Sequence, residues 1–380
     1  MYAEAMTSVS DPSARPGTLG VVFDKDRRFV AIGLWDPTSP IRLRVLHAGK
    51  PRVIDADHWH EVLEHAYRSR QVLTRRGSTG WRLLHGENDG AGGLVIDHYD
   101  STLVCKIYSS CWLPHLTAVL EAAVATVEPE RVVLRLGRLA AGDPTVREAG
   151  LRDGMMLRGE APDGPVRFTE NDLTFEADVI KGQKTGHFLD QRDNRQMIKA
   201  TSKGARVLDV FSCTGGFSVH AAAGGATEVH SVDIAEPAIA AAKRNMHYNR
   251  SVTGSARHVT TTGDAFEVMD RLGRSGERYD VVIIDPPSFA SKSSERDGAI
   301  RAYRKLSELG LPLVRPGGRL LQASCSSRVT EDDLVATVFS AARSQGRSFR
   351  SHEVTGHALD HPITFPQGAY LKALTGIIDG

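Results

Sequence analysis

Short runs rich in Val, Ile and Leu alternate with helical patterns through the second half of the chain. The predicted strands are residues 206–211, 228–233, 258–262, 280–285 and 319–324. The predicted helices are residues 217–223, 237–248, 265–272, 299–314 and 330–342. Strands that alternate with helices form a parallel, doubly wound sheet, whose ligands bind at the carboxyl ends of the strands. We therefore predict an α/β domain with a doubly wound parallel sheet that carries the chemistry.

Two smaller segments precede this domain in a chain of 380 residues, which is long enough for two or three domains. A small β-rich domain is predicted over residues 1–74, from strands at 19–23, 29–34 and 41–47 and a helix at 56–70. A compact α+β domain is predicted over residues 75–180, from strands at 81–84, 94–98, 102–108 and 131–136 and a helix at 115–127. The third domain takes residues 181–380 and ends in strands near 350–354 and 370–377.

Charge is distributed unevenly along the chain. Residues 1–86 contain 13 Lys or Arg against 9 Asp or Glu, residues 87–180 contain 8 against 16, and residues 181–380 contain 26 against 21. Basic ends around an acidic middle suit a protein that contacts an anion with two of its three parts.

Several classes of protein are disfavoured by what the sequence lacks. No run approaches 18 apolar residues, so no membrane span is predicted, and the N-terminus lacks the pattern of a secretory signal. The 4 cysteines form no CxxC pair, which argues against a disulfide framework and favours a reducing cytoplasm. The 15 histidines form no metal-binding spacing, and no metal site is predicted.

The first predicted strand runs into a glycine turn, VLDVFSCTGGF, with Asp209 in the strand end and Gly215 and Gly216 at the helix start. The turn matches neither GxGxxG nor GxxxxGK[ST], which argues against a dinucleotide or a nucleoside triphosphate. Asp233 and Asp264 end the next two strands, where Asp233 can accept both ribose hydroxyls and Asp264 suits an adenine edge. Three acids in this order fit a nucleoside with a cationic group. The alternative is that each Asp only caps the following helix.

The fourth predicted strand ends in Asp285, which is followed by Pro286, Pro287 and then Phe289. Two prolines fix the backbone just beyond the strand and aim Asp285 toward the ligand edge. An aromatic ring at this edge can stack on a planar base. The alternative is a rigid loop without a binding role.

The fifth predicted strand delivers Cys325 to the same edge as Asp285, among small polar residues. A thiol in this place is a candidate nucleophile. The alternative is an inert buried cysteine. Cys213 is predicted to pack beside the ligand, and Cys105 and Cys111 are predicted to be core residues.

Residues 181–195, KGQKTGHFLDQRDNR, are dense in hydrogen-bonding groups and lie just before the first strand. Gly182 and Gly186 permit a close approach of the backbone. Asp190 or Asp193 is predicted to cap a helix. The alternative is a solvated charged loop.

These features together resemble the class I S-adenosylmethionine-dependent methyltransferases, and more narrowly the bacterial 23S ribosomal RNA large subunit methyltransferase I family of cytosine-5 enzymes. The matching strings are GENDGAGGLVIDHYD, GQKTGHFLDQRDNR, VLDVFSCTGGFSV, VDIAEPAIAAAKRN, VVIIDPPSFA, ASCSS and DHPITFPQGAYLKA, which run in the family's order from residue 86 to residue 373. GQKTGHFLDQR and SCS are far more specific than the strings shared by the whole fold.

The resemblance implies an N-terminal PUA-like RNA-binding domain, a middle EEHEE domain and a C-terminal Rossmann-like catalytic domain, in the places of the three predicted segments. The family's longer basic opening with a His-Pro-Trp string is absent before Leu19, and the two explanations are an N-terminally trimmed PUA-like domain or a misassigned start codon. Ribosomal RNA is the implied partner, and the sequence leaves a homodimer open.

The resemblance also implies S-adenosylmethionine as the cofactor and the following roles. Cys325 attacks carbon 6 of a cytosine and Asp285 holds the edge of the base, while the general base is not assigned. Cofactor contacts are expected from Lys184, Thr185, Gln191, Asp209, Phe211, Thr214, Gly215, Gly216, Asp233, Ile234, Asp264, Ala265, Phe266 and Asp285. Substrate contacts are expected from Pro286, Pro287 and Phe289.

Three rival functions stay open at this point. An N-methyltransferase acting on guanine or adenine would use Asp285-Pro286-Pro287 and leave Cys325 without a role. An RNA-binding assembly factor would lack catalysis, although its cofactor residues are intact. A small-molecule methyltransferase would have little use for two additional domains.

Overall fold

The computed structural model describes residues 1–290 and 292–380, and the chain divides into two compact units. The first unit comprises Met1–Asp172, Glu176–Leu189 and Leu359–Thr364. The second comprises Leu173–Phe175, Asp190–Ala358 and Phe365–Gly380.

The first unit begins with a small antiparallel sheet of order β1-β2-β3. Its strands are β1 (Leu19–Phe23), β2 (Phe29–Trp35) and β3 (Leu43–Ala48), which confirms the three strands predicted for this segment. Helix α1 (Ala56–Arg75) follows, and its N-cap Asp55 accepts a hydrogen bond from the backbone N–H of His58.

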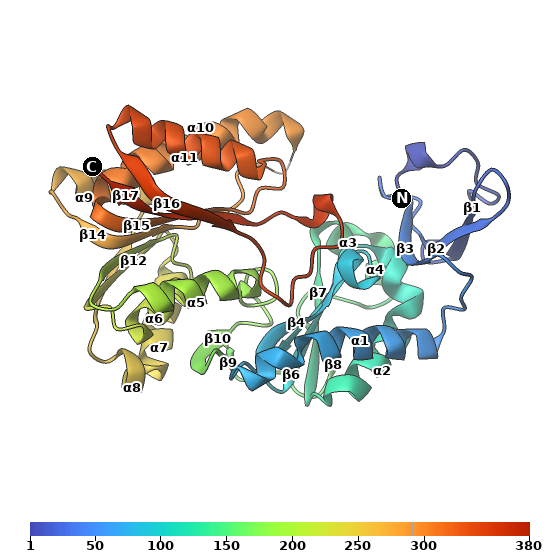
Figure 1. The fold of residues 1–380 in the computed structure, drawn as a ribbon. Coiled ribbons are helices and arrows are strands. Elements are labelled where there is room, and N and C mark those ends of the chain that lie inside the picture. Colours follow the sequence, from blue (N-terminus) through green and yellow to red (C-terminus); the bar gives the residue numbers. More distant parts are fainter. Residues whose placement is uncertain (291) are drawn as a thin grey trace. The chain divides into compact units, whose positions relative to one another are not determined.

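The larger sheet of the first unit has the order β4-β5-β6-β7-β8. Its strands are β4 (Gly80–His85), β5 (Leu94–Tyr99), β6 (Thr102–Ile107), β7 (Arg131–Leu136) and β8 (Met155–Arg158). Only β6 and β7 run parallel, and α2 (Leu116–Val127) makes the crossover between them. Helices α1 and α2 lie along this sheet (Figure 1). The rings of Trp59 and Trp112 pack in the core of this unit, with their centroids 5.5 Å apart.

Segment Ser110–Val127 is long and apolar enough, by length and composition, to cross a membrane. Its Trp112, Val119 and Ala123 are fully buried in the core of the first unit. The core helix of a folded domain has the same length and composition, and the burial of these residues assigns α2 to the core of the first unit.

Sequence reasoning missed the short elements that follow. They are α3 (Arg138–Gly142), α4 (Pro144–Glu148), β8, β9 (Val166–Glu170) and β10 (Leu173–Ala177). Asn171 and Asp172 join β9 to β10, and both have positive φ, 51° and 64°. Two such residues are typical of a hairpin turn of type I′, so this dipeptide was a usable signal.

The second unit is built on a seven-stranded sheet of order β13-β12-β11-β14-β15-β17-β16. Its strands are β11 (Arg206–Val210), β12 (Glu228–Asp233), β13 (Arg257–Thr262), β14 (Tyr279–Ile284), β15 (Val314–Ser324), β16 (Ser348–Thr355) and β17 (Lys372–Asp379). The first five in the order are parallel, and β17 runs antiparallel to both β15 and β16. The strand order reverses at β11, which confirms the doubly wound prediction.

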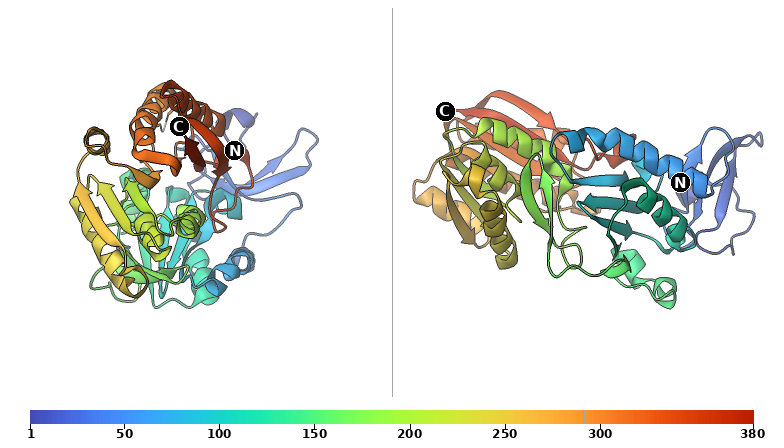
Figure 2. Two further views of the ribbon diagram at one scale, coloured as in Figure 1. Left: turned by 60° about the vertical axis from the view of Figure 1, so that its left-hand side comes forward. Right: turned by 90° about the horizontal axis from the view of Figure 1, so that it is seen from below.

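Helices cover both faces of this sheet (Figures 1 and 2). One face carries α5 (Arg192–Thr201), α6 (Gly216–Ala223) and α7 (Glu236–Tyr248), with the short α8 (Arg250–Thr253) beside them. The other carries α9 (Ala265–Arg274), α10 (Arg296–Gly310) and α11 (Glu331–Ser344). Fully buried Leu208, Val282 and Leu320 pack under this second group, because a strand covered on both faces excludes water from each side chain.

Two details differ from the sequence predictions. The helix predicted over residues 299–314 ends at Gly310, because Pro312 follows and β15 begins at Val314. The prediction that Asp190 or Asp193 caps a helix is wrong. The N-cap of α5 is Gln191, which makes no side-chain capping bond, and Asp190 Oδ2 instead accepts a hydrogen bond from the Tyr370 hydroxyl at 2.8 Å.

Candidate active site at the carboxyl edge of the second sheet

The carboxyl ends of β11, β12, β14 and β15 meet at one edge of the second sheet, because these strands are adjacent and parallel. The edge carries Asp209 and the glycine turn from β11, Asp233 from β12, Asp285 after β14 and Cys325 after β15. The topology thus collects the principal residues predicted for the site.

The turn after β11 has an unusual backbone. Phe211, Cys213 and Gly215 have positive φ of 64°, 47° and 77°. A Cβ atom on Gly215 would lie 2.8 Å from the Cβ of Ala242, so only glycine fits between the turn and α7. The turn therefore presents backbone, rather than side chains, at the start of α6.

Asp233 fastens this turn to the end of β12. Its Oδ2 accepts a hydrogen bond from the backbone N–H of Cys213 at 2.8 Å, and its Oδ1 accepts one from Ala235 at 2.9 Å. The next residue, Ile234, exposes 70% of its surface. A carboxylate beside an exposed apolar side chain and a glycine turn suits the ribose and the base of a nucleoside.

Asp209 is fully buried beneath the turn. Its Oδ2 accepts a hydrogen bond from the Ser218 hydroxyl at 2.6 Å, and burial raises the pKa of its carboxyl to about 7. Within residues 1–290 and 292–380, Asp209 Oδ1 and Ser212 Oγ are buried without a hydrogen-bond partner. Such unpartnered polar atoms at the ligand edge fit a site that takes a polar ligand.

Asp264 caps helix α9, which is the alternative that the sequence left open for this residue. Its Oδ1 accepts hydrogen bonds from the backbone N–H groups of Phe266 and Glu267, at 2.9 and 3.2 Å, and so caps α9. Ala265 is buried, and Phe266 packs against the core. The contact of these residues with an adenine stays a prediction.

Cys325 lies beside the Asp285-Pro286-Pro287 loop. Its Sγ is 3.8 Å from the carbonyl oxygen of Pro286, and the residue is partly exposed. The backbone N–H of Asp285 bonds to the carbonyl of Val210 at 3.3 Å, which ties the loop to the end of β11. The thiol and the acid therefore share one edge, as the sequence predicts.

The two serines that flank Cys325 hold it in this place. Ser326 Oγ accepts hydrogen bonds from the backbone N–H groups of Phe289 and Ala290, at 3.0 and 3.3 Å. The Tyr303 hydroxyl lies 3.0 Å from Ser326 Oγ and accepts a hydrogen bond from Ser324 Oγ at 2.8 Å. Both serines are fully buried, so the turn after β15 is bonded to the proline loop.

The aromatic ring predicted to stack on a base has a neighbour in the protein. Phe289 packs edge-on against Tyr303, with ring centroids 5.2 Å apart. Sequence reasoning missed Tyr303 and Ser326, and also Lys372, whose Nζ donates to the carbonyl of Ser326. The alternation in the string SCS was a signal for the serines, because residues two apart in a strand point to the same face.

The remaining thiols differ from Cys325 in position. Cys105 and Cys111 are fully buried in the first unit, as predicted, and burial raises the pKa of their thiols to about 12 and about 11. Cys213 lies in the glycine turn, where burial raises the pKa of its thiol to about 11. A buried thiol of raised pKa is a poor nucleophile.

Three predicted cofactor residues come from the segment before the second sheet. Thr185 is buried in the first unit, where its Oγ1 hydrogen-bonds to the Asp97 carboxyl and lies 3.3 Å from the Tyr99 hydroxyl. Lys184 has its Nζ 4.3 Å from the centre of the Phe188 ring. Gln191, in the second unit, accepts a hydrogen bond from Asn194 at 2.6 Å. Their contact with a cofactor stays a prediction.

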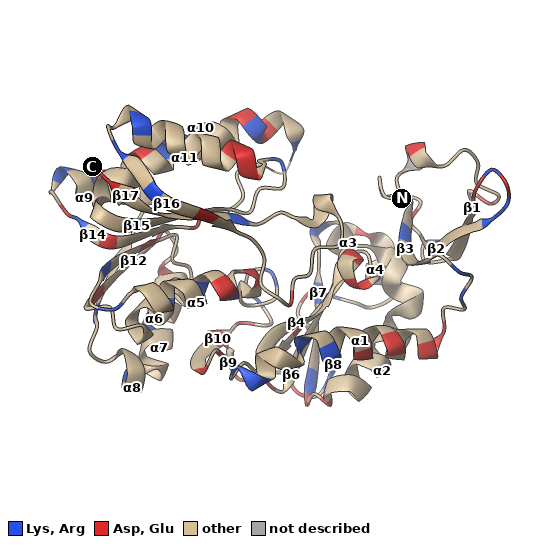
Figure 3. Ribbon diagram, viewed as in Figure 1, with Lys and Arg blue, Asp and Glu red and all other residues tan. Residues whose placement is uncertain are grey.

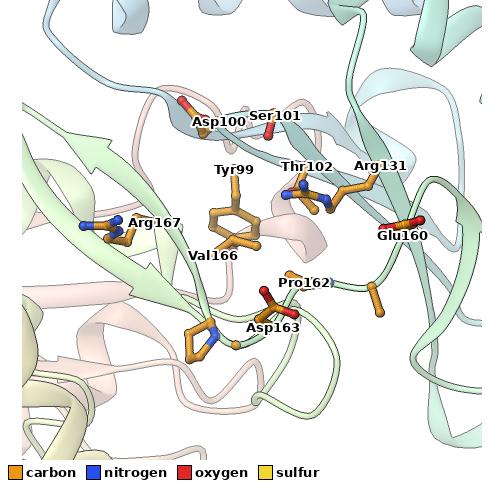
Figure 4. A pocket seen from close by; sticks show the side chains of 13 residues that line it. Tyr99, Asp100, Ser101, Thr102, Arg131, Glu160, Pro162, Asp163, Val166 and Arg167 are labelled. Carbon is orange, nitrogen blue, oxygen red and sulfur yellow. The ribbon is translucent and has the colours of Figure 1, made fainter.

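A separate pocket lies in the first unit (Figure 4). Tyr99, Thr102, Arg131, Asp163 and Arg167 are among its lining residues. None of the residues predicted for catalysis or cofactor binding lines it. In the described ranges, no group of three His, Cys, Asp or Glu side chains could hold a metal ion.

Known proteins match this chain over most of its length. A family model for S-adenosylmethionine-dependent methyltransferases matches residues 155–374, and a model for PUA-like domains matches residues 1–48. A ribosomal RNA large subunit methyltransferase of Deinococcus radiodurans is 46% identical over 376 residues, which cover 98% of this chain and 91% of that protein. The chain belongs to the ribosomal RNA large subunit methyltransferase I family. Its cofactor is therefore S-adenosylmethionine.

One further relative agrees with this membership, and one solved structure agrees with the fold. Ribosomal RNA large subunit methyltransferase I of Aeromonas salmonicida is 36% identical over 360 residues, which cover 93% of this chain and 88% of that protein. A solved methyltransferase complexed with SAH superimposes with a TM-score of 0.80 at 21% identity, over 96% of this chain and 93% of that one. At this identity the structural likeness supports the fold alone.

We expect Asp209→Asn to change how stability depends on pH. The folded-state pKa of about 7 lies above the ordinary value of 3.8, so folding takes up a proton between these values. The stability from this group is complete below about pH 4 and is lost as the pH rises toward 7. From about pH 4 to pH 8, the variant should therefore gain on the order of 4 kcal/mol relative to wild type. Denaturant unfolding across this pH range measures the free energy of unfolding of both proteins, and Asp270→Asn is the surface control. A difference between variant and wild type that does not change with pH would contradict the prediction.

We expect Ser326→Ala to loosen the link between the turn after β15 and the proline loop. It leaves the N–H groups of Phe289 and Ala290 without their acceptor, at a cost of about 1–3 kcal/mol in unfolding free energy. Denaturant unfolding measures the loss, and Ser327→Ala, an exposed neighbour, is the matched control. Equal midpoints for the two variants would show that this bond does not hold the site together.

Proposed function

We propose that this protein transfers a methyl group from S-adenosylmethionine to carbon 5 of a cytosine in 23S ribosomal RNA, through a covalent bond between Cys325 and the base. The single observation that carries the proposal is the position of Cys325, with its Sγ 3.8 Å from the carbonyl of Pro286 and directly beside the Asp285 loop. The two relatives named above are methyltransferases of large subunit ribosomal RNA, which supports this class of substrate.

The chemistry of the base explains why a thiol is needed. Carbon 5 of cytosine is a poor nucleophile on its own. Addition of the Cys325 thiolate to carbon 6 moves the electron pair of the 5,6 double bond to carbon 5, which then takes the methyl group. Loss of the proton from carbon 5 re-forms the double bond and releases the thiolate. The bound cofactor supplies the methyl group in the form of a sulfonium electrophile.

We assign Asp285 to holding the base. Its carboxyl lies at the same edge as Cys325, where it can bond to the ring nitrogen and the exocyclic amine as charge develops there. Pro286 and Pro287 fix the backbone of this loop, and the bond from Asp285 N–H to Val210 fixes its distance from the sheet. The proposal leaves the general base for the carbon 5 proton unassigned.

The neighbouring residues are suited to the cofactor. The glycine turn over Thr214, Gly215 and Gly216 brings backbone groups to the edge, and we assign Asp233, which is bonded to this turn, to the ribose hydroxyls. The exposed side chain of Ile234 suits the adenine. Asp209 is buried beneath the turn, and its carboxyl lies in the part of the site that we assign to the cofactor.

The exposed residues of the small N-terminal sheet are suited to contact with RNA. Leu19, Val21 and Phe23 of β1 are exposed at alternate positions, so they share one face, and Lys25 and Arg27 are exposed in the turn that follows. Residues of both charges follow one another along this turn (Figure 3), where Arg28 is paired with Asp24 and Asp26. Exposed aromatic and basic groups bind single-stranded nucleic acid by stacking and by charge. The target base must leave its stack, at a cost of about a few kcal/mol.

We expect Cys325→Ala to bind S-adenosylmethionine as wild type does but to lose methyl transfer to cytosine by at least about 1,000-fold, because only the covalent step needs the sulfur. Calorimetry measures cofactor binding, and mass mapping of modified nucleosides in ribosomal RNA measures the product. Ser327→Ala in the same turn should keep both cofactor binding and methyl transfer. Cytosine methylation by Cys325→Ala would reject the adduct, and a methylated guanine or adenine would point to the rival N-methyltransferase.

We expect Asp233→Ala to weaken cofactor binding by about 10- to 100-fold. The change removes the acceptor for two ribose hydroxyls and also frees the backbone of Cys213 and Ala235. Calorimetric titration with S-adenosylmethionine gives the affinity, and Asp270→Ala, which removes a surface carboxyl of α9, is the control. An unchanged affinity for Asp233→Ala would reject the ribose contact.

A further inference from the structure

The string DHPITFPQGAYLKA near the C-terminus has no part in the chemistry proposed above. The string reaches Lys372, the first residue of β17. Antiparallel pairing places Lys372 directly opposite Ser324 of β15, the residue before Cys325. The fold thus brings a cation next to the turn that carries the thiol.

The ammonium group of Lys372 is buried and held in a fixed position. Only 6% of the residue is exposed. Its Nζ donates hydrogen bonds to the carbonyl oxygens of Ser326 at 2.7 Å and Val329 at 2.5 Å, both in the turn after Cys325. These acceptors are neutral, and in the described part of the chain Lys372 forms no ion pair with a carboxylate. A buried cation without a nearby anion is costly, so a compensating negative charge is expected close by.

The charged and titratable groups that act on Lys372 come from two places, the turn after β15 and helix α11. Burial lowers the pKa of the Lys372 ammonium, and Cys325 opposes this more than Asp333 and Glu331 do. Asp333 is already paired with Arg296, whose Nη2 lies 2.5 Å from its Oδ1. Cys325 therefore stands out among these groups, because Lys372 Nζ is bonded to the carbonyl of the next residue, Ser326.

We propose that Lys372 is a positioning residue that stabilises the thiolate of Cys325 by its charge and fixes the turn that carries it. The inference rests on the proposed function, since the thiolate is the nucleophile there. The Asp285 carboxylate at the same edge repels a thiolate, and Lys372 offsets this repulsion. The thiol proton leaves to water, because Cys325 is partly exposed, and Lys372 stays protonated while it donates to both carbonyls.

The test follows the alkylation of Cys325 by iodoacetamide as a function of pH, in the full chain without RNA. Mass spectrometry of the peptide that contains Cys325 gives the rate. In wild type we expect a midpoint below the ordinary thiol value of about 8.5. Lys372→Met should move the midpoint up by about one pH unit and slow alkylation near pH 7 about tenfold. Lys372→Arg should keep the midpoint near that of wild type, and Lys305→Met, which removes an exposed lysine of α10, should not move it.

A purely structural role for Lys372 would lower the melting temperature of Lys372→Met and leave the midpoint unchanged, and this result would overturn the proposal. A wild-type midpoint at or above about 8.5 would also overturn it, even if Lys372→Met failed to fold. Alkylation needs no RNA, so the two proposals fail separately. Cytosine methylation by Cys325→Ala together with a shifted midpoint in Lys372→Met would reject the adduct and keep the charge effect.

Discussion

The site depends on the hydroxyl of Ser326. Strands β14 and β15 are neighbours in the sheet, but beyond their ends each continues into its own loop. Ser326 Oγ accepts from the N–H groups of Phe289 and Ala290, and this pair of bonds closes the gap between the two loops. Because Ser326 is fully buried, water cannot replace these bonds without cost. Cys325 therefore faces the carbonyl of Pro286 rather than solvent alone.

The strands of the second sheet could be predicted from the sequence for a simple physical reason. A parallel strand covered on both faces buries side chains at successive positions and is rich in Val, Ile and Leu, and the interiors of β11, β12 and β14 are buried in this way. The elements that were missed lack it. Strand β8 has four residues and none is buried, and the hairpin at Asn171 and Asp172 is marked by backbone geometry instead of apolar periodicity.

The site could be predicted where the residues lie at the ends of parallel strands, since topology alone brings such ends together. This applies to Asp233, Asp285 and Cys325. Tyr303 and Lys372 could not be found in this way. Tyr303 reaches the turn from α10, and Lys372 reaches it from a strand that pairs antiparallel to β15, a pairing that the chain order does not reveal.

The proposed methyl transfer requires a bond between the Cys325 sulfur and carbon 6 of a cytosine, and this bond can be trapped. Fluorine at carbon 5 cannot leave as a proton does, so an RNA that contains 5-fluorocytidine should hold the enzyme after methyl transfer. Mass spectrometry of the digested complex, formed with S-adenosylmethionine, should find a methylated fluorocytidine attached to the peptide that contains Cys325. A complex with no covalent nucleotide, or with one on another residue, would rule out the Cys325 adduct.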